Sequence, residues 1–276
     1  MSDYPDIDFL HIDGDLFIYR CANACAEEPV FIACSTMDKM LGSILMAFPE
    51  VGYQVYLSGA SSENYRHQYA ITAPYKGNRK QEKPKHYDAL RQYLMDDWGA
   101  TMSHGNEADD TISIDYTTRW KAHCKNPEST SVPCVVSVDK DFDQLTGLRY
   151  DFVKEELVWK TQHEANLNLY RQVMEGDTAD NVKGIFGVGK VKAAKFLAEC
   201  NTPKEMYDVC VEKFIELADC TADEAHLRVE ENLNLVFLQR VEGEYFRSPD
   251  GSKETKSTED ESREDVDGSK VLGVPA

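Results

Sequence analysis

The sequence predicts an α/β protein with a mostly parallel sheet, followed by a helical region. Short apolar segments typical of strands alternate with segments of helical periodicity through the first half of the chain. Aspartates stand at the ends of two of these apolar segments, where parallel sheets form their sites. From about Gln162 onward the pattern is helical, apart from one glycine-rich turn. A chain of 276 residues is long enough for one large domain or two small ones with a sizeable core.

Three strands and four helices are expected before Gln162. The strands are short apolar runs at residues 7–12, 53–57 and 134–138. Pro84 suits the first turn of a helix, and Asn106 is a good N-cap. The expected helices therefore begin after the turn 13–15, cover 36–48, begin at Pro84, and run from Asn106 to about Lys121.

The chain divides into three expected parts. These are an α/β domain over 1–161, a helical region over 162–247 and an acidic tail over 248–276. The tail carries 8 acidic and 4 basic residues and no aromatic residue. Because such a segment has little apolar surface to bury, we expect it to be disordered.

Composition narrows the class of protein. The 8 cysteines form no CxxC pair, which favours reduced thiols over a zinc site. No apolar run approaches the roughly 20 residues that span a bilayer, and no secretory signal is visible. We therefore expect a cytoplasmic protein without membrane contact. The net charge of −19 is unusual for a nucleic-acid enzyme, which commonly has a basic face, but bound divalent metal ions would offset part of it.

Four acidic groups are the candidate metal ligands. Each alone has an ordinary explanation, because Asp is common in turns and acidic residues favour the first turn of a helix. An α/β sheet would bring several of them together, where unpaired carboxylates repel one another and a hard cation such as Mg²⁺ relieves the repulsion. Two such ions can activate a water molecule and stabilise the leaving oxygen of a phosphodiester. The candidates are Asp13; Glu107, Asp109 and Asp110; Asp139 and Asp141; and Asp177 and Asp180.

Residues 65–85 are the most basic stretch of this acidic protein. Cations interleaved with aromatic rings suit a strand of nucleic acid, because cations meet phosphates and rings stack on bases. A solvated basic loop is the alternative explanation. The residues concerned are Arg66, Lys76, Arg79, Lys80, Lys83 and Lys85, with Tyr65, Tyr69 and Tyr75.

A second candidate for nucleic-acid contact is the glycine-rich segment 182–192. Closely spaced glycines before a helix expose backbone N–H groups to an anion. The segment is not a P-loop, because Val191 stands where that motif needs Ser or Thr. A hairpin that grips the DNA backbone is the better interpretation, with Lys183, Gly184, Gly187, Gly189, Lys190 and Lys192 as its contact residues.

Five segments, in this order, resemble the structure-specific 5′ nucleases, which include flap endonucleases and phage 5′–3′ exonucleases. They are DGDLFIYR at 13–20, YKGNR at 75–79, EADD at 107–110, VSVDKDF at 136–142 and GDTADNVKGIFGVGK at 176–190. The resemblance covers roughly residues 7–200 and is closest to the phage members, since no polymerase region is present.

The resemblance implies a PIN-like nuclease domain with a helical arch at about 60–100, then a helix–three-turn–helix motif. By matching positions, all eight candidate carboxylates are metal-site residues. Lys76 and Arg79 match basic residues at the scissile phosphate, Arg20 matches an arginine near the cleaved strand, and Tyr75 matches a residue near the terminal bases. The implied cofactors are two Mg²⁺ ions, for which Mn²⁺ substitutes, and a K⁺ ion at the helix–three-turn–helix motif.

The implied activity is metal-dependent 5′–3′ exodeoxyribonuclease and 5′-flap endonuclease action, in phage-type DNA replication or DNA degradation. The implied partners are DNA with a 5′ end or flap, an RNA–DNA hybrid and replication proteins, bound by a monomer in the host cytoplasm. One departure is Ser58, which stands where many relatives have an Asp and leaves the site one carboxylate short. A PIN-type ribonuclease and a non-catalytic DNA-binding protein remain alternatives.

Overall fold

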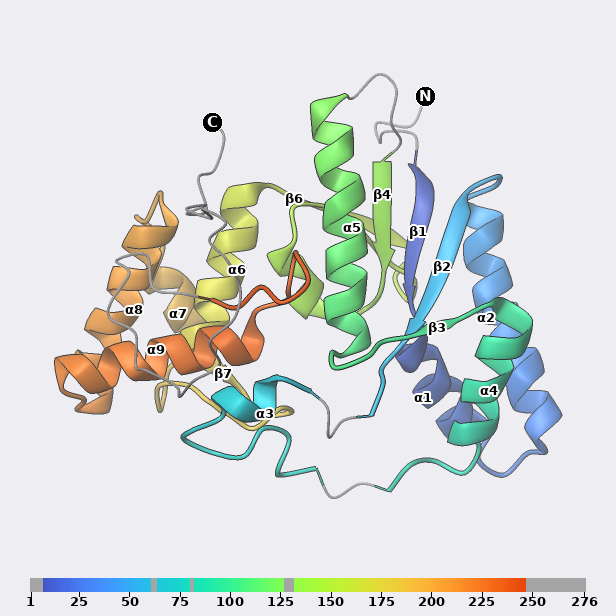
Figure 1. Ribbon diagram of the computed structural model, residues 1–276, viewed down its shortest axis with the longest axis horizontal. Helices are drawn as coiled ribbons and strands as arrows, with labels where there is room; N and C mark the ends of the chain where they lie inside the picture. The colour runs from blue at the N-terminus through green and yellow to red at the C-terminus, as the bar shows by residue number, and fades with distance from the viewer. Residues whose placement is uncertain (1–6, 61–63, 80–81, 127–131, 247–276) are drawn as a thin grey trace, which may run out of the picture.

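The computed structural model describes residues 7–60, 64–79, 82–126 and 132–246. Lys80 and the predicted acidic tail lie outside these ranges. A six-stranded sheet occupies one part of the molecule and a group of helices the other (Figure 1). The predicted mixed fold with a mostly parallel sheet is therefore confirmed.

The sheet has the order β3-β2-β1-β4-β5-β6. All neighbouring pairs are parallel except β5 and β6, which form an antiparallel edge. Leu10 of β1 pairs with Cys134 of β4, and Ile12 pairs with Val55 of β2. The strands are β1 (Ile7–Asp13), β2 (Gly52–Leu57), β3 (Thr101–Met102), β4 (Val132–Val136), β5 (Gly147–Asp151) and β6 (Glu156–Lys160).

The alternation of side chains along the central strands divides the core into two layers. Leu10 and Ile12 belong to the largest core cluster, with α1 (Gly14–Ala24), α2 (Val30–Ala47) and α4 (Tyr87–Trp98). Tyr56 and Val135 point to the other face, where they pack with α5 (Ala108–Lys125). Both faces of the central strands are therefore covered, as a parallel sheet requires.

The helical region has a core of its own, drawn from α6 to α9. Thr161, Thr202 and Thr221 each form a capping box with a glutamate three residues later, which fixes where α6, α8 and α9 begin. The elements are α6 (Gln162–Glu175), β7 (Gly176–Asp177), β8 (Val182–Lys183), α7 (Lys190–Phe196), α8 (Pro203–Ala218) and α9 (Ala222–Val236).

Several expected boundaries move in the structure. Helix α2 begins at Val30 rather than Thr36, α4 begins at Tyr87 rather than Pro84, and Glu107 rather than Asn106 caps α5. Strands β3, β5 and β6 were not predicted. The expected arch, about 60–100, is helical in its described residues only at α3 (Arg66–Tyr69) and α4.

Between α3 and α4, the described residues 70–79 and 82–86 form a strap of irregular backbone. It passes beneath α9 and β7 and then reaches α4, which packs against the sheet rather than over the site (Figure 1). Tyr87, Leu90 and Leu94 of α4 are buried in the largest core cluster. Helix α4, which falls within the expected arch, therefore belongs to the core.

Helix α2 is the one described helix that is long and apolar enough to cross a membrane by length and composition, with 18 residues and a mean hydropathy of 1.4. The expectation that no segment approaches that length is corrected accordingly. Its Ala33, Met37, Leu41 and Ile44 are buried against α1, α4 and the sheet.

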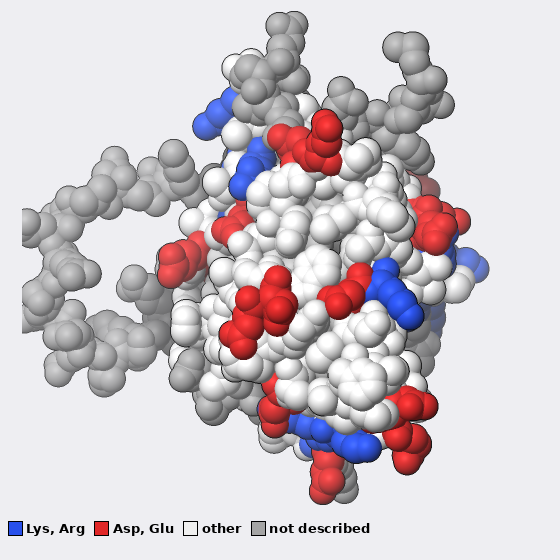
Figure 2. All heavy atoms as spheres, turned by 90° about the vertical axis from the view of Figure 1, so that its right-hand side faces the viewer, with Lys and Arg blue, Asp and Glu red and all other residues white. Residues whose placement is uncertain are grey.

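Figure 2 shows the end of the molecule that carries α2 and α4, where scattered Asp and Glu outnumber Lys and Arg on a mostly uncharged face.

Candidate active site

The carboxyl ends of β1 and β4 bring the first two predicted carboxylates together. Asp13 ends β1 and is 3% exposed. The Ser137 hydroxyl, just after β4, donates to Asp13 Oδ2 at 3.1 Å and accepts from the Asp139 N–H at 3.0 Å. Asp139 Oδ1 in turn accepts from the Asp141 N–H at 2.9 Å. One chain of hydrogen bonds therefore fixes three carboxylates across two neighbouring strands.

The start of α5 places the next carboxylates beside this edge. Ser58, directly after β2, accepts a hydrogen bond from the Ala108 N–H through its Oγ at 3.0 Å. Its own N–H donates to Asp15 Oδ2 at 2.9 Å. Ser58 thus satisfies a free N–H of the first helical turn, which holds Glu107 and Asp109 at the sheet edge.

The turn between β7 and β8 carries the last two carboxylates. Asp177 Oδ1 accepts from the Ala179 N–H at 2.7 Å, and Asp180 Oδ1 accepts from Arg79 Nη2 at 2.6 Å. The Lys76 N–H donates to the Asp180 carbonyl at 2.9 Å, and Lys76 Nζ pairs with Glu107 and lies 3.6 Å from Asp180 Oδ2. The YKGNR loop and this turn therefore form one unit.

These segments enclose a cavity of about 20 Å³, enough for about one water molecule. It lies between the end of the sheet and the helical region. Its lining includes five of the predicted carboxylates: Glu107, Asp109, Asp141, Asp177 and Asp180.

Crowding of like charges perturbs the acidic groups. Burial, followed by the charges of Asp15 and Asp139, raises the pKa of Asp13 to about 7. Burial, followed by Asp139 and Asp177, raises the pKa of Asp141 to about 7 as well. The pKa of Asp109 lies well above its ordinary value because of burial and then the charges of Asp13 and Asp139. The carboxylates are therefore close enough to destabilise one another in the ionised state.

The donor set fits a hard divalent cation, although the side chains face other partners. Among the described residues, no three His, Cys, Asp or Glu side chains are arranged to hold a metal ion. Glu107 and Asp180 face Lys76, and Asp141 accepts from Gln172 Nε2. The fit rests on chemistry: the donors are carboxylate oxygens, and their mutual repulsion is what a cation such as Mg²⁺ relieves.

The fold has known counterparts. No family model and no curated protein matches the chain. Bacteriophage T5 5′-exonuclease, solved with divalent zinc ions, matches with a TM-score of 0.61 and 18% identity over 83% of this chain and 89% of that one. T5 D15 protein, co-crystallised with metal ions, gives a TM-score of 0.59 at 18% identity, covering 83% and 88%. The catalytic core of Rad2 in complex with a DNA substrate gives 0.50 at 12% identity, covering 87% and 80%.

The chain has the fold of the structure-specific 5′ nucleases. This confirms, at the level of fold, the resemblance drawn from the five sequence segments. The matches extend over both the sheet and the helical region, because they cover more than four fifths of the chain.

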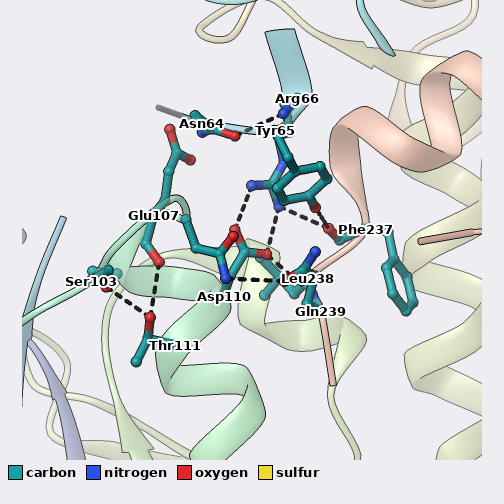
Figure 3. Close-up of polar contacts among 12 residues, drawn as sticks. Asn64, Tyr65, Arg66, Ser103, Glu107, Asp110, Thr111, Phe237, Leu238 and Gln239 are labelled. Atoms are coloured by element: carbon teal, nitrogen blue, oxygen red, sulfur yellow. Dashed lines mark hydrogen bonds and ion pairs between the residues drawn. The ribbon is translucent and has the colours of Figure 1, made fainter. Parts of the chain in front are cut away.

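Within this 5′ nuclease fold, Asp110 is not placed as a metal ligand. It is fully buried, and its two oxygens accept from Arg66 Nη1 at 2.5 Å and Nη2 at 2.8 Å (Figure 3). Its Oδ1 also accepts from the Gln239 N–H at 3.1 Å. The Glu107 side chain points away from this pair (Figure 3). Adjacent residues of a helix point about 100° apart, so Asp109 faces the cavity while Asp110 faces the protein.

Arg66 is likewise unavailable to DNA. It is 2% exposed, and besides Asp110 it donates to the carbonyls of Leu235 at 3.0 Å and Phe237 at 2.8 Å. The Arg66–Asp110 pair therefore joins α3, α5 and the segment after α9. Arg66 was predicted as a DNA contact, and the structure gives it a structural role instead.

Tyr75 is also buried rather than presented to bases. It is 4% exposed, and its hydroxyl donates to Asp180 Oδ2 at 2.8 Å and lies 3.2 Å from Glu107 Oε2. Burial and the Glu107 charge hold its pKa well above the ordinary value, so the hydroxyl stays a donor between two carboxylates. Tyr75 therefore positions the acidic centre instead of stacking on DNA.

Two further predicted residues take other places. The Arg20 guanidinium lies 5.4 Å from the centre of the Phe152 ring, and within the described part of the chain no ion pair links it to the carboxylates. A Cβ on Gly184 would lie 2.3 Å from the Glu175 carbonyl carbon, so this glycine permits close backbone packing. Gly187 and Gly189 face open space, and Lys183, Lys190 and Lys192 are exposed.

Asp15 is a functional candidate that was not predicted as a metal ligand. After burial, the Asp15 charge is the largest cause of the raised pKa of Asp13. Asp15 Oδ2 accepts a hydrogen bond from the Ser58 N–H, and its Oδ1 is buried without a hydrogen-bond partner among the described residues. Its position two residues after a strand-end aspartate was the available signal. Arg91 Nη1 lies 4.0 Å from Asp15 Oδ1 and offsets part of its charge.

Proposed function

We propose that this protein is a divalent-metal-dependent 5′ nuclease that acts on DNA as a 5′–3′ exonuclease and 5′-flap endonuclease. The observation that carries the proposal is the acidic centre. Carboxylates from four distant segments meet at the carboxyl edge of a parallel sheet, with two cations fixed against them. The fold shared with T5 5′-exonuclease and the Rad2 core supports this activity.

Seven residues would hold the metal ions: Asp13, Glu107, Asp109, Asp139, Asp141, Asp177 and Asp180. Two bound Mg²⁺ ions would supply an activated water and charge stabilisation for the leaving oxygen. Mn²⁺ is expected to substitute, because it accepts the same oxygen donors. Asp110 is left out because both of its oxygens are held by Arg66.

Lys76 and Arg79 would position the scissile phosphate. Lys76 has a φ of 55°, an uncommon conformation for a lysine, and its ammonium is held at the acidic centre by Glu107 and Asp180. Arg79 is about half exposed and pairs with Asp180. Once metal ions neutralise the carboxylates, both cations can turn to phosphate oxygens, where fixed positive charge stabilises the transition state.

Duplex DNA would lie along the segment 182–196 of the helical region. This segment carries four lysines and no acidic residue, in a chain of net charge −19. Attraction of phosphate to these lysines would orient the duplex so that its 5′ end reaches the sheet edge. This placement reconciles an acidic protein with a polyanionic substrate, because four lysines lie on one segment that has no acidic residue of its own.

The test follows the label released from a defined substrate. A DNA duplex with a 5′ flap, labelled at either the 5′ or the 3′ end of the flap strand, is incubated with Mg²⁺ or with EDTA. We expect Mg²⁺-dependent short products from the 5′ label and shortened strands from the 3′ label. Cleavage that proceeds in EDTA, or that starts from the 3′ end, would contradict the proposal. Cutting of an all-RNA substrate in preference to DNA would favour a PIN-type ribonuclease instead.

A further inference from the structure

The side chain of Phe186 is 100% exposed, the highest value among the large apolar side chains that the structure describes. A phenyl ring in water is unfavourable, and burying one fully is worth roughly 2–3 kcal/mol. Isolated exposed apolar residues are common on protein surfaces, so exposure alone identifies no site. The local backbone and the surrounding charge carry the inference further.

The backbone presents the Phe186 ring in a fixed turn. The Val188 N–H donates to the Ile185 carbonyl at 3.0 Å, which closes a turn with Phe186 and Gly187 in the middle. Gly187 has a φ of +75°, as the third residue of a type II turn requires. Ile185 and Val188 on either side are 3% and 4% exposed and anchor the turn in the helical core. Phe186 therefore projects outward, because the first and last residues of the turn, Ile185 and Val188, are buried.

The surroundings of Phe186 are cationic. Lys183, Lys190, Lys192 and Lys195 are exposed within ten residues of it, and 182–196 contains no Asp or Glu. Among the described residues, Lys190, Lys192 and Lys195 form no ion pair with a carboxylate. An exposed apolar ring on a segment whose lysines are not paired with carboxylates complements a polyanion that also has an apolar surface. Duplex DNA has that combination, in its phosphates and the faces of its deoxyriboses.

We propose that Phe186 enters the minor groove of the duplex, packs on deoxyribose, and makes this protein favour DNA over RNA duplexes. This inference rests on the proposed function, since it assumes that 182–196 is the duplex contact. Apolar side chains in the minor groove are an established way to engage B-form DNA. In an RNA duplex the wide, shallow minor groove is lined by 2′-hydroxyls, which the ring would remove from water without a hydrogen bond in return.

The experiment compares variants of the full chain by fluorescence anisotropy. The probes are a 20-base-pair DNA duplex and an RNA duplex of the same sequence, in EDTA so that neither is cut. Phe186→Ala should weaken DNA binding about tenfold, the effect of burying roughly half a phenyl ring, and change RNA binding less than about twofold. Phe186→Leu should recover most of the DNA affinity. Phe31→Ala is the matched control, because Phe31 is 65% exposed on α2, at the opposite end of the molecule from the helical region.

A salt titration separates an apolar contact from a phosphate contact. The slope of log K against log salt should be the same for wild type and Phe186→Ala, whereas Lys190→Ala should lower its magnitude by about one. Equal DNA affinity of wild type and Phe186→Ala would overturn the inference, as would equal losses for DNA and RNA or a changed salt slope. These outcomes leave the nuclease proposal standing. Failure of the wild-type protein to bind the DNA duplex at all would remove both.

Discussion

At the scale of single residues, the site is defined by which polar groups face the cavity and which are satisfied elsewhere. Asp109 and Asp110 are neighbours in sequence. Burial, followed by the charges of Asp13 and Asp139, raises the pKa of Asp109, whereas Asp110 forms an ion pair with Arg66. Lys76 and Tyr75 are similarly adjacent, and both contact Glu107 and Asp180. The role of each of these residues can therefore be tested separately.

Lys76→Ala should lower the single-turnover cleavage rate by about 10²-fold, with only a small loss of DNA affinity. A fixed cation at a phosphate that gains charge stabilises the transition state more than the ground state. Lys213→Ala is the matched control, because the Lys213 side chain is also 18% exposed and pairs with glutamates, but on α8. Small losses for Lys76→Ala that recover at low salt would mean that Lys76 belongs to a solvated basic loop.

The pH dependence of stability follows from Asp13 and Asp141. Their pKa values are raised to about 7, so the folded metal-free protein holds protons that the unfolded chain has released between pH 4 and 7. Stability without metal should therefore fall as pH rises through this window, at about 1.4 kcal/mol for each unit of pKa shift. Mg²⁺ competes with these protons, so it should raise Tm more at pH 8 than at pH 6.

Thermal unfolding in EDTA and in Mg²⁺ at the two pH values measures both effects. The variant Asp13→Asn with Asp141→Asn should lose part of the pH dependence in EDTA, since Asp109 and Asp139, whose pKa values are also raised, remain. A Tm increase by Mg²⁺ that is equal at pH 6 and pH 8 would show that these carboxylates do not bind the ion.

At the scale of elements, α3, α5 and the segment after α9 meet at the Arg66–Asp110 pair. Removal of one partner of a buried pair leaves an uncompensated charge, which costs about 3–5 kcal/mol. Asp110→Ala should therefore lower the free energy of unfolding in urea by this amount. Arg66→Met combined with Asp110→Leu should restore much of it, because the charges are replaced by apolar groups.

Metal binding distinguishes this structural role from the ligand role first expected of Asp110. In calorimetric titrations of folded protein, the Arg66→Met, Asp110→Leu variant should bind Mg²⁺ with near wild-type affinity. A loss of Mg²⁺ affinity comparable to that of Asp139→Ala would return Asp110 to the metal set.

The elements show which parts of the fold the sequence predicts. Asp13 ends β1 as predicted, and Asp139 lies at the same edge although β4 ends three residues before it, because a parallel sheet aligns its carboxyl edges. Strands β5 and β6 were not predicted because their sequences, GLRYD and ELVWK, are short and contain charged residues, as loops commonly do. The partner of Arg66 lies 44 residues away, and no local pattern reveals such a pair. The directions of the Asp109 and Asp110 side chains depend on where α5 begins. An error of one residue in the predicted N-cap changes these directions.

At the scale of the whole molecule, charge is distributed so that an acidic protein can act on DNA. The acidic centre lies between the sheet and the helical region, and the lysines of 182–196 lie on the helical side. The end that carries α2 and α4 offers few cations (Figure 2). Metal ions at the acidic centre and the lysines beside it would together provide a positively charged binding surface for the substrate on a protein of net charge −19.

The most direct test of this account is single-turnover cleavage of a 5′-flap DNA over a range of Mg²⁺ concentrations by wild type, Asp139→Ala and Asp208→Ala. Asp139 lies in the acidic centre, whereas Asp208 forms a surface pair with Lys204 on α8. We predict that wild type and Asp208→Ala cut with the same Mg²⁺ dependence. Asp139→Ala should keep its fold by circular dichroism but lose cleavage by at least about 10²-fold at every concentration, since it removes a ligand of the ions that activate the water. Full activity of folded Asp139→Ala at saturating Mg²⁺ would contradict the central claim that these carboxylates form the metal site of a nuclease.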